Sequence, residues 1–215
     1  MKRPAVILAI MFFTSTAVFP QFSFYLVDNF EDGDYSSGPK WWGFGELKTK
    51  VVSNPPLETK DLIAESCGDY ALNLCGESKQ WYVGGVGTDL SVDASEFSRF
   101  QIDVNGDGEG KGRLKIELFD DDNMNYSLEQ DPQKNYDPIH DDKWVAEVSI
   151  QGKGFIRTSI PFSAFRDANP GVGDDIWNPD QKDGSGGLLK MQLVAISETE
   201  QGKVDFSIDN LLLTY

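Results

Sequence analysis

Apolar and polar residues alternate in short segments along the chain, and clusters of glycine, proline, aspartate and asparagine separate these segments. The clearest segment is 113–119, in which Leu114, Ile116 and Leu118 share one face and charged residues occupy the other. Successive side chains of a β-strand point to opposite faces, so this pattern predicts a strand with one buried and one solvated face. The same pattern predicts strands at 100–104, 144–150, 155–162, 188–196 and 204–213.

Two long polar segments, 120–142 and 167–187, separate these strands and are predicted to be loops. A glycine-rich segment, 106–112, is predicted to be a short flexible connection. No segment keeps a helical period over three turns, and no linker or internal repeat divides the chain. About 190 residues fit one β-sandwich, so we expect a single all-β domain at 21–215.

The first twenty residues differ in composition from the rest. A basic start, Met1 to Arg3, precedes an apolar run from Ala5 to Phe13 and then small residues. This order is typical of a secretory signal peptide and predicts an extracellular or periplasmic protein. A membrane anchor is the alternative, but the apolar run breaks at Thr14 and Pro20, well short of the ~20 residues that cross a bilayer. We therefore expect no membrane span once residues 1–20 are removed.

Charge restricts the choice of partners. Nineteen basic and thirty-five acidic residues give a net charge of -16. Such a field repels nucleic acid and anionic lipid, so neither is an expected partner. Neutral glycans, cations and basic proteins remain compatible with it.

Cys67 and Cys75 are the two cysteines of the chain. An exported protein would ordinarily bridge such a pair. The residues between them include a strand-like run, 70–74, and eight extended residues would separate the two Cα atoms by roughly 25 Å. A disulfide therefore requires the chain to fold back at 67–69, and both the bridged and the free state stay open. Two thiols and one histidine do not fill a tetrahedral zinc shell.

Acidic residues lie at both ends of the predicted domain. Asp28-Asn29-Phe30-Glu31-Asp32-Gly33 follows the predicted signal peptide, and Ser207-Ile208-Asp209-Asn210-Leu211 lies close to the C-terminus. The first and last strands of a closed two-sheet fold often lie side by side, so these carboxylates could converge. Hard oxygen ligands of this kind suit a structural calcium ion.

The same two segments carry a family resemblance. Together with Trp41-Trp42-Gly43, Tyr70 to Leu74 and Trp81 to Gly87, they resemble carbohydrate-binding modules of the galactose-binding-like jelly-roll type, with family eleven the nearest. The resemblance implies an all-β, two-sheet antiparallel jelly-roll sandwich and a polysaccharide or oligosaccharide as partner. It also implies a calcium ion held from both termini. The implied metal ligands are Glu31 and Asp209, which match best, with Asp28 and Asp32 beside them.

Sugar recognition needs flat apolar surface for the pyranose ring and polar groups for its hydroxyls. Aromatic candidates at strand ends or in polar loops are Trp81, Tyr82 and Tyr126. Polar candidates that alternation points away from the core are Asn73, Lys115, Glu117 and Gln192. Further aromatic residues predicted to be exposed are Trp41, Trp42, Tyr136 and Trp177.

Catalysis is not predicted. His140 is the single histidine, and no glycine-flanked serine accompanies it. Acids are plentiful in 120–142, but abundance alone specifies no glycosidase. Two alternatives to a noncatalytic sugar-binding module stay open: an extracellular or envelope subunit that uses the sandwich for self-assembly or for contact with an envelope protein, and a small glycan-active enzyme.

Overall fold

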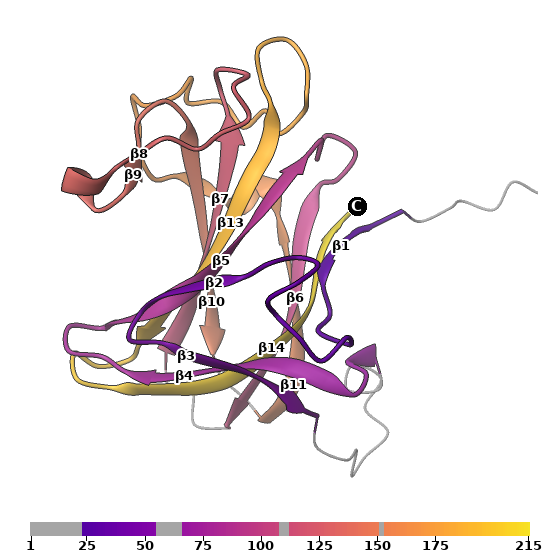
Figure 1. Cartoon of the computed structure of the whole chain (residues 1–215), viewed down its shortest axis with the longest axis vertical. Coiled ribbons are helices and arrows are strands. Elements are labelled where there is room, and N and C mark those ends of the chain that lie inside the picture. Colours follow the sequence, from indigo (N-terminus) through magenta and orange to yellow (C-terminus); the bar gives the residue numbers. More distant parts are fainter. Residues whose placement is uncertain (1–22, 55–65, 108–111, 151–152) are drawn as a thin grey trace, which may run out of the picture.

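Two antiparallel β-sheets form the two layers of the computed structural model, which describes residues 23–54, 66–107, 112–150 and 153–215 (Figure 1). The predicted signal peptide, residues 1–20, lies outside the described residues. Within the described part of the chain, no helix is long and apolar enough to span a membrane.

The first sheet, sheet A, has the strand order β11-β6-β14-β4-β3, and a sixth strand, β1, also pairs with β14. Its strands are β1 (Tyr25–Asp28), β3 (Lys48–Ser53), β4 (Tyr70–Glu77), β6 (Arg99–Asp107), β11 (Lys153–Pro161) and β14 (Lys203–Thr214).

The second sheet, sheet B, has the order β12-β10-β7-β13-β5-β2. Its strands are β2 (Trp42–Gly45), β5 (Tyr82–Val92), β7 (Gly112–Asp121), β10 (Asp142–Ile150), β12 (Arg166–Asp167) and β13 (Gly187–Ser197). The predicted loop 120–142 contains a two-stranded ribbon and a 3-10 turn, and a second 3-10 turn follows β11. These elements are β8 (Gln130–Asp131), η1 (Pro132–Lys134), β9 (Asp137–Pro138) and η2 (Phe162–Ala164).

The hydrophobic core lies between the two sheets and is built by the alternation seen in the sequence. On β7, Leu114, Ile116 and Leu118 are fully buried, and on β14 Phe206 and Ile208 face them from the other layer. The predicted strands, the two predicted loops and the two-sheet antiparallel fold are all confirmed.

The two ends of the described chain meet in sheet A. β1 runs antiparallel to β14, with Tyr25 opposite Leu213 and Leu26 opposite Leu212, and Figure 1 shows β1 beside the C-terminal strand. A bulge follows Asp209 in β14, where Asn210 has a positive φ of 46°. The expected approach of the first and last strands is therefore confirmed, and it places the acidic segment after β1 near this bulge.

Both cysteines are free thiols. Cys67 is buried, with its Sγ 3.4 Å from Asp103 Oδ2, while Cys75 lies in the extended strand β4. The chain between them runs on into that strand, so the fold-back that a bridge requires does not occur.

Candidate functional site

Three of the predicted ligand residues lie together on the outer surface of sheet B, which we call the sheet-B face. Lys115 and Glu117 point outward from β7 because their neighbours Ile116 and Leu118 fill the core. Gln192 of β13 lies directly opposite Glu117 in the register, so their side chains are neighbours on the same face.

Glu117 is only 7% exposed although it lies on the solvent side of the sheet. Lys115 holds it through an ion pair of 2.7 Å between Nζ and Oε1. Burial raises the pKa of the Tyr82 phenol, and the negative charge of Glu117 raises this pKa further because the two side chains lie close together. Tyr82 is itself 48% exposed, so it presents aromatic surface beside a buried, charge-paired carboxylate.

Two further aromatic rings extend the face over β5. Trp42 and Phe44 belong to β2, where they pair with Gly87 and Gly85. A Cβ atom at Gly87 would come within 2.6 Å of the Trp42 ring, and one at Gly85 within 2.4 Å of the Phe44 ring. Both rings therefore lie against the β5 backbone, where only glycine leaves room.

The acids of the face are each matched by a cation. Besides Lys115 and Glu117, Arg113 pairs with Glu147 at 3.0 Å, and Lys190 lies 3.8 Å from Asp89. The Lys190 Nζ also lies 5.0 Å from the centroid of the Trp42 ring, within cation–π range. The face thus alternates aromatic rings with donors and acceptors held in place by ion pairs.

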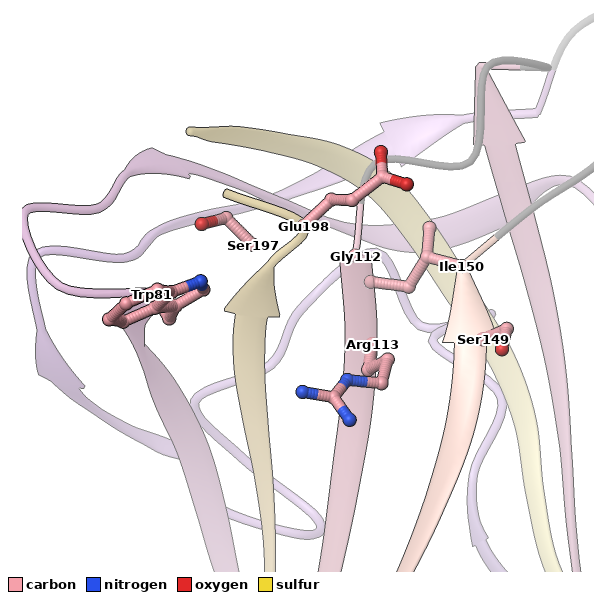
Figure 2. Close-up of a pocket in the computed structure, with 7 residues that line it drawn as sticks. All are labelled: Trp81, Gly112, Arg113, Ser149, Ile150, Ser197 and Glu198. Atoms are coloured by element: carbon pink, nitrogen blue, oxygen red, sulfur yellow. The ribbon is translucent and has the colours of Figure 1, made fainter. Parts of the chain in front are cut away.

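Trp81 lies at one end of this face, beside an open pocket of about 370 Å³. The pocket is lined by Trp81, Gly112, Arg113, Ser149, Ile150, Ser197 and Glu198. Figure 2 shows Trp81 and Arg113 on opposite sides of β13, in agreement with the strand order. The indole is 48% exposed, as is the ring of Tyr82, its neighbour in the chain.

The remaining predicted ligand residues lie elsewhere. Asn73 is on β4 of sheet A, where its amide donates to Asp205 and to the Phe206 carbonyl, so it cannot share a site with Lys115 and Gln192. Tyr126 is exposed in the loop that follows β7, where its backbone N–H donates to Asp121.

Of the aromatic residues expected at the surface, Trp41 is buried and Trp177 is partly buried. Trp41 is only 3% exposed, and its indole N–H donates to Asp28 at 2.7 Å. Trp177 packs against Phe162 and Trp144, with ring centroids 4.9 and 5.7 Å apart. The predicted exposure of Trp41 is therefore wrong, because its ring fills space in the core, and that of Trp177 is reduced by packing against the core.

The two best-matching metal candidates come together at the meeting of the termini, an arrangement we call the terminal clasp. Glu31 accepts hydrogen bonds from the backbone N–H groups of Asp69 and Tyr70, each at 3.0 Å. Asp209 is fully buried; its Oδ1 accepts from Asn210 N at 2.6 Å, and its Oδ2 has no hydrogen-bond partner. Burial raises the pKa of Asp209 to about 8, and the charges of Asp103 and Glu31 add to this effect.

The other two candidates at the N-terminal end already serve the local fold. Asp28 accepts from Phe30 N through Oδ1 and from the Trp41 indole through Oδ2, so both its oxygens are engaged. Asp32 accepts from Asp34 N in an exposed turn. The terminal clasp is thus centred on Glu31 and Asp209. The Asp209 oxygen without a partner is the candidate ligand for a cation there.

Solved structures with the same fold were found, whereas no protein-family model and no curated protein sequence matches the chain. The family 11 carbohydrate-binding module of the cellulosomal cellulase Lic26A-Cel5E of Clostridium thermocellum is 14% identical, with a TM-score of 0.52 over 90% of this chain and 95% of that chain. The Clostridium thermocellum family 11 module in complex with a β-1,3-1,4-mixed-linked tetrasaccharide is 15% identical, with a TM-score of 0.52 over 89% and 95%. An exo-β-agarase is 12% identical, with a TM-score of 0.52 over 88% of this chain and 25% of that chain. The chain therefore has the jelly-roll fold of β-sandwich carbohydrate-binding modules.

Proposed function

We propose that this protein is a secreted, noncatalytic carbohydrate-binding module that binds a polysaccharide or oligosaccharide on the sheet-B face. The observation that carries the proposal is the grouping of exposed aromatic rings with ion-paired polar side chains on one sheet. Tyr82 and Trp42 offer ring surface, while Lys115, Glu117 and Gln192 offer donors and acceptors beside them.

This chemistry matches the two surfaces of a sugar. Pyranose C–H groups pack on an aromatic face, and the hydroxyls hydrogen-bond to amide, ammonium and carboxylate groups. The ion pairs hold these polar groups before a ligand arrives, which reduces the cost of ordering them on binding.

An extended chain is the ligand that this surface fits best. From Arg113 to Phe119 the face follows β7 for six residue steps, about 20 Å of strand, and the Trp81 pocket continues it at the Arg113 end. The likeness to a module with a bound mixed-linked tetrasaccharide supports a β-glucan as the first ligand to try.

A binding role fits the face better than hydrolysis does. A glycosidase needs two carboxyl groups on either side of the scissile bond, one of them free to give a proton. Glu117, Glu147 and Asp89 are instead each paired with a lysine or arginine. Each carboxylate is thus engaged with a cation and is not free to protonate a leaving group.

Affinity for barley mixed-linkage β-glucan, measured by affinity electrophoresis and calorimetry, tests this proposal. We expect Tyr82→Ala to weaken binding at least about tenfold, equivalent to ~1.4 kcal/mol, because it removes exposed ring surface beside Glu117. Tyr70→Ala is the matched control, since Tyr70 is an exposed tyrosine on sheet A. Equal binding by the two variants would place the sugar elsewhere.

No retention of the wild type on any insoluble or soluble glycan would instead favour an assembly role, which size-exclusion chromatography would reveal.

The proposal includes export and a structural calcium ion. The composition of residues 1–20 supports export. Support for the ion is the terminal clasp, where Glu31 and Asp209 would hold it and join the first strand region to the last. A bound cation there would neutralise carboxylates whose mutual repulsion otherwise opposes closure of the fold.

Removing the clasp carboxylate should remove this ion. We expect Asp209→Asn to bind one calcium fewer per chain than the wild type in native mass spectrometry. Asp205→Asn is the control, because Asp205 is an exposed acid on the same strand. An unchanged calcium count in Asp209→Asn would rule out the clasp as a calcium site.

A further inference from the structure

A second group of acids lies at the opposite end of β7 from the Trp81 pocket. Asp120 lies near the end of β7, Asp122 directly follows the strand, and Asp142 begins β10 opposite Asp120 in the register. One carboxylate oxygen from each lies within 4.8 Å of the others. We call these three residues the loop cluster, because the loops 120–142 and 167–187 meet over it.

The loop cluster differs from a solvated acidic turn by its burial. Asp120 and Asp142 are fully buried. Asp120 uses both oxygens, accepting from the Trp144 indole at 2.9 Å and from Asn178 N at 3.1 Å. These hydrogen bonds hold its carboxylate in a fixed orientation at the base of the cluster.

The other two carboxylates each keep one oxygen without a partner. Asp122 Oδ2 accepts from Asp142 N at 2.8 Å, and Asp142 Oδ2 accepts from Ile176 N at 3.2 Å. This leaves Asp122 Oδ1 and Asp142 Oδ1 buried and unsatisfied, and Asn178 Oδ1 is a third such oxygen. Orphaned acceptors of this kind are rare in folded proteins and call for a missing partner.

The unsatisfied oxygens are enclosed by the second loop. A Cβ atom at Gly173 would lie 2.4 Å from Asp142 Oδ1 and 2.2 Å from Asp122 Oδ2, so this loop backbone closes directly over the pair. No lysine, arginine or histidine among the described residues forms an ion pair with the three acids. Three carboxylates packed together without a counter-charge repel one another unless a cation or bound protons neutralise them.

Catalysis does not account for these acids. Glycosidase carboxyl groups must reach a sugar in the open, whereas Asp120 and Asp142 are fully buried beneath the loop. We infer that the loop cluster binds a divalent cation, with Asp122 Oδ1 and Asp142 Oδ1 as ligands and Asp120 as the third carboxylate. An all-oxygen, carboxylate-rich set in flexible loops selects calcium. This site is separate from the terminal clasp and does not rest on sugar binding.

The cation would join two long loops to the end of sheet B. Asp122 belongs to the loop that carries Tyr126, and Gly173, Ile176 and Asn178 belong to the loop before β13. Neither loop has an apolar core of its own, so one ion with ligands from β10 and the β7 loop, enclosed by the second loop, would order them together.

Calcium titration of the full chain tests the inference. We expect the double variant D122N/D142N to bind one calcium fewer per chain and to lose about 5–10 °C of the calcium-induced rise in Tm, measured at a hundredfold excess over Kd. Asp183→Asn, which changes an exposed acid in the enclosing loop 167–187, should behave as wild type. Asp209→Asn should retain this ion, which separates the loop cluster from the clasp.

Terbium luminescence gives a second readout, which reports a metal ion close to a tryptophan. The Trp144 indole donates to Asp120, so a terbium ion in the loop cluster should emit on tryptophan excitation, and calcium should displace it. The emission should persist in Asp209→Asn, which lacks the clasp carboxylate, and should be weaker in D122N/D142N than in the wild type; circular dichroism in EDTA checks the fold of the double variant. The same calcium count and the same rise in Tm for D122N/D142N and wild type would overturn the inference. So would an absence of calcium-displaceable terbium emission from Asp209→Asn.

Discussion

Arg157→Leu should lower the free energy of unfolding by about 3 kcal/mol, the typical cost of removing one partner from a buried ion pair. Arg157 on β11 donates to both oxygens of Asp103 on β6, from Nε at 2.8 Å and from a terminal nitrogen at 2.7 Å. Asp103 is fully buried, and its negative charge also acts on Asp209, so loss of the guanidinium would leave this carboxylate without its counter-charge. Equilibrium denaturation in urea measures the loss.

A matched variant separates this effect from the general cost of losing an arginine. Arg113→Leu breaks an ion pair with Glu147 in which both side chains are substantially exposed, at 54% and 32%. Exposed pairs contribute under about 1 kcal/mol, so Arg113→Leu should be close to neutral. Equal stability of the two variants would contradict this prediction, because it would mean that the buried Asp103 does not need Arg157 as its counter-charge.

The fold could be predicted from the sequence because the pattern reports directly on burial. Alternation along 113–119 and 204–213 gave strands whose apolar positions do face the core. The approach of the two ends was predicted from the fold class, because the first and last strands of a closed two-sheet fold often lie side by side. The acidic segments flank these two strands. The choice of Glu31 and Asp209 among these acids came from the resemblance to carbohydrate-binding modules and not from the alternation.

Alternation does not tell which sheet a strand joins. Asn73 and Lys115 both point away from the core, yet one lies on sheet A and the other on sheet B. Long-range pairing decides this, and no local pattern encodes it. Trp42 and Phe44 show the same limit. Their strand, β2, has only four residues, and the position of the two rings depends on Gly87 and Gly85 of β5.

The loop cluster was harder still to recognise. In the sequence, Asp120 to Asp122 and Asp141-Asp142 are simply acids in polar loops, as in many acidic proteins. Their burial depends on the β7–β10 register and on Gly173 closing over them. Paired acids on either side of a long insertion, each next to a strand end, are the signal that could have drawn attention to them.

The stability of the calcium-free protein should fall by several kcal/mol as the pH rises from 5 to 8, opposite to the trend expected for salt-bridged carboxylates. Burial raises the pKa of Asp120 to about 8 and that of Asp122 to about 7, with further increases from neighbouring acids. Burial likewise raises the pKa of Asp142 to about 6. The folded state then binds more protons than the unfolded state, whose aspartates titrate near 3.8, so stability is complete below about pH 4 and is lost as the pH passes through these values.

Urea denaturation in EDTA at several pH values measures this slope, and Asp120→Asn should reduce it because one of the most perturbed carboxyls is gone. Flat or rising stability from pH 5 to 8 would contradict the prediction. Saturating calcium should abolish the decline in the wild type, since a bound cation replaces the protons and favours ionised carboxylates. The loop cluster would then make the protein less stable in neutral, calcium-free solution than in mild acid, and most stable where calcium is abundant.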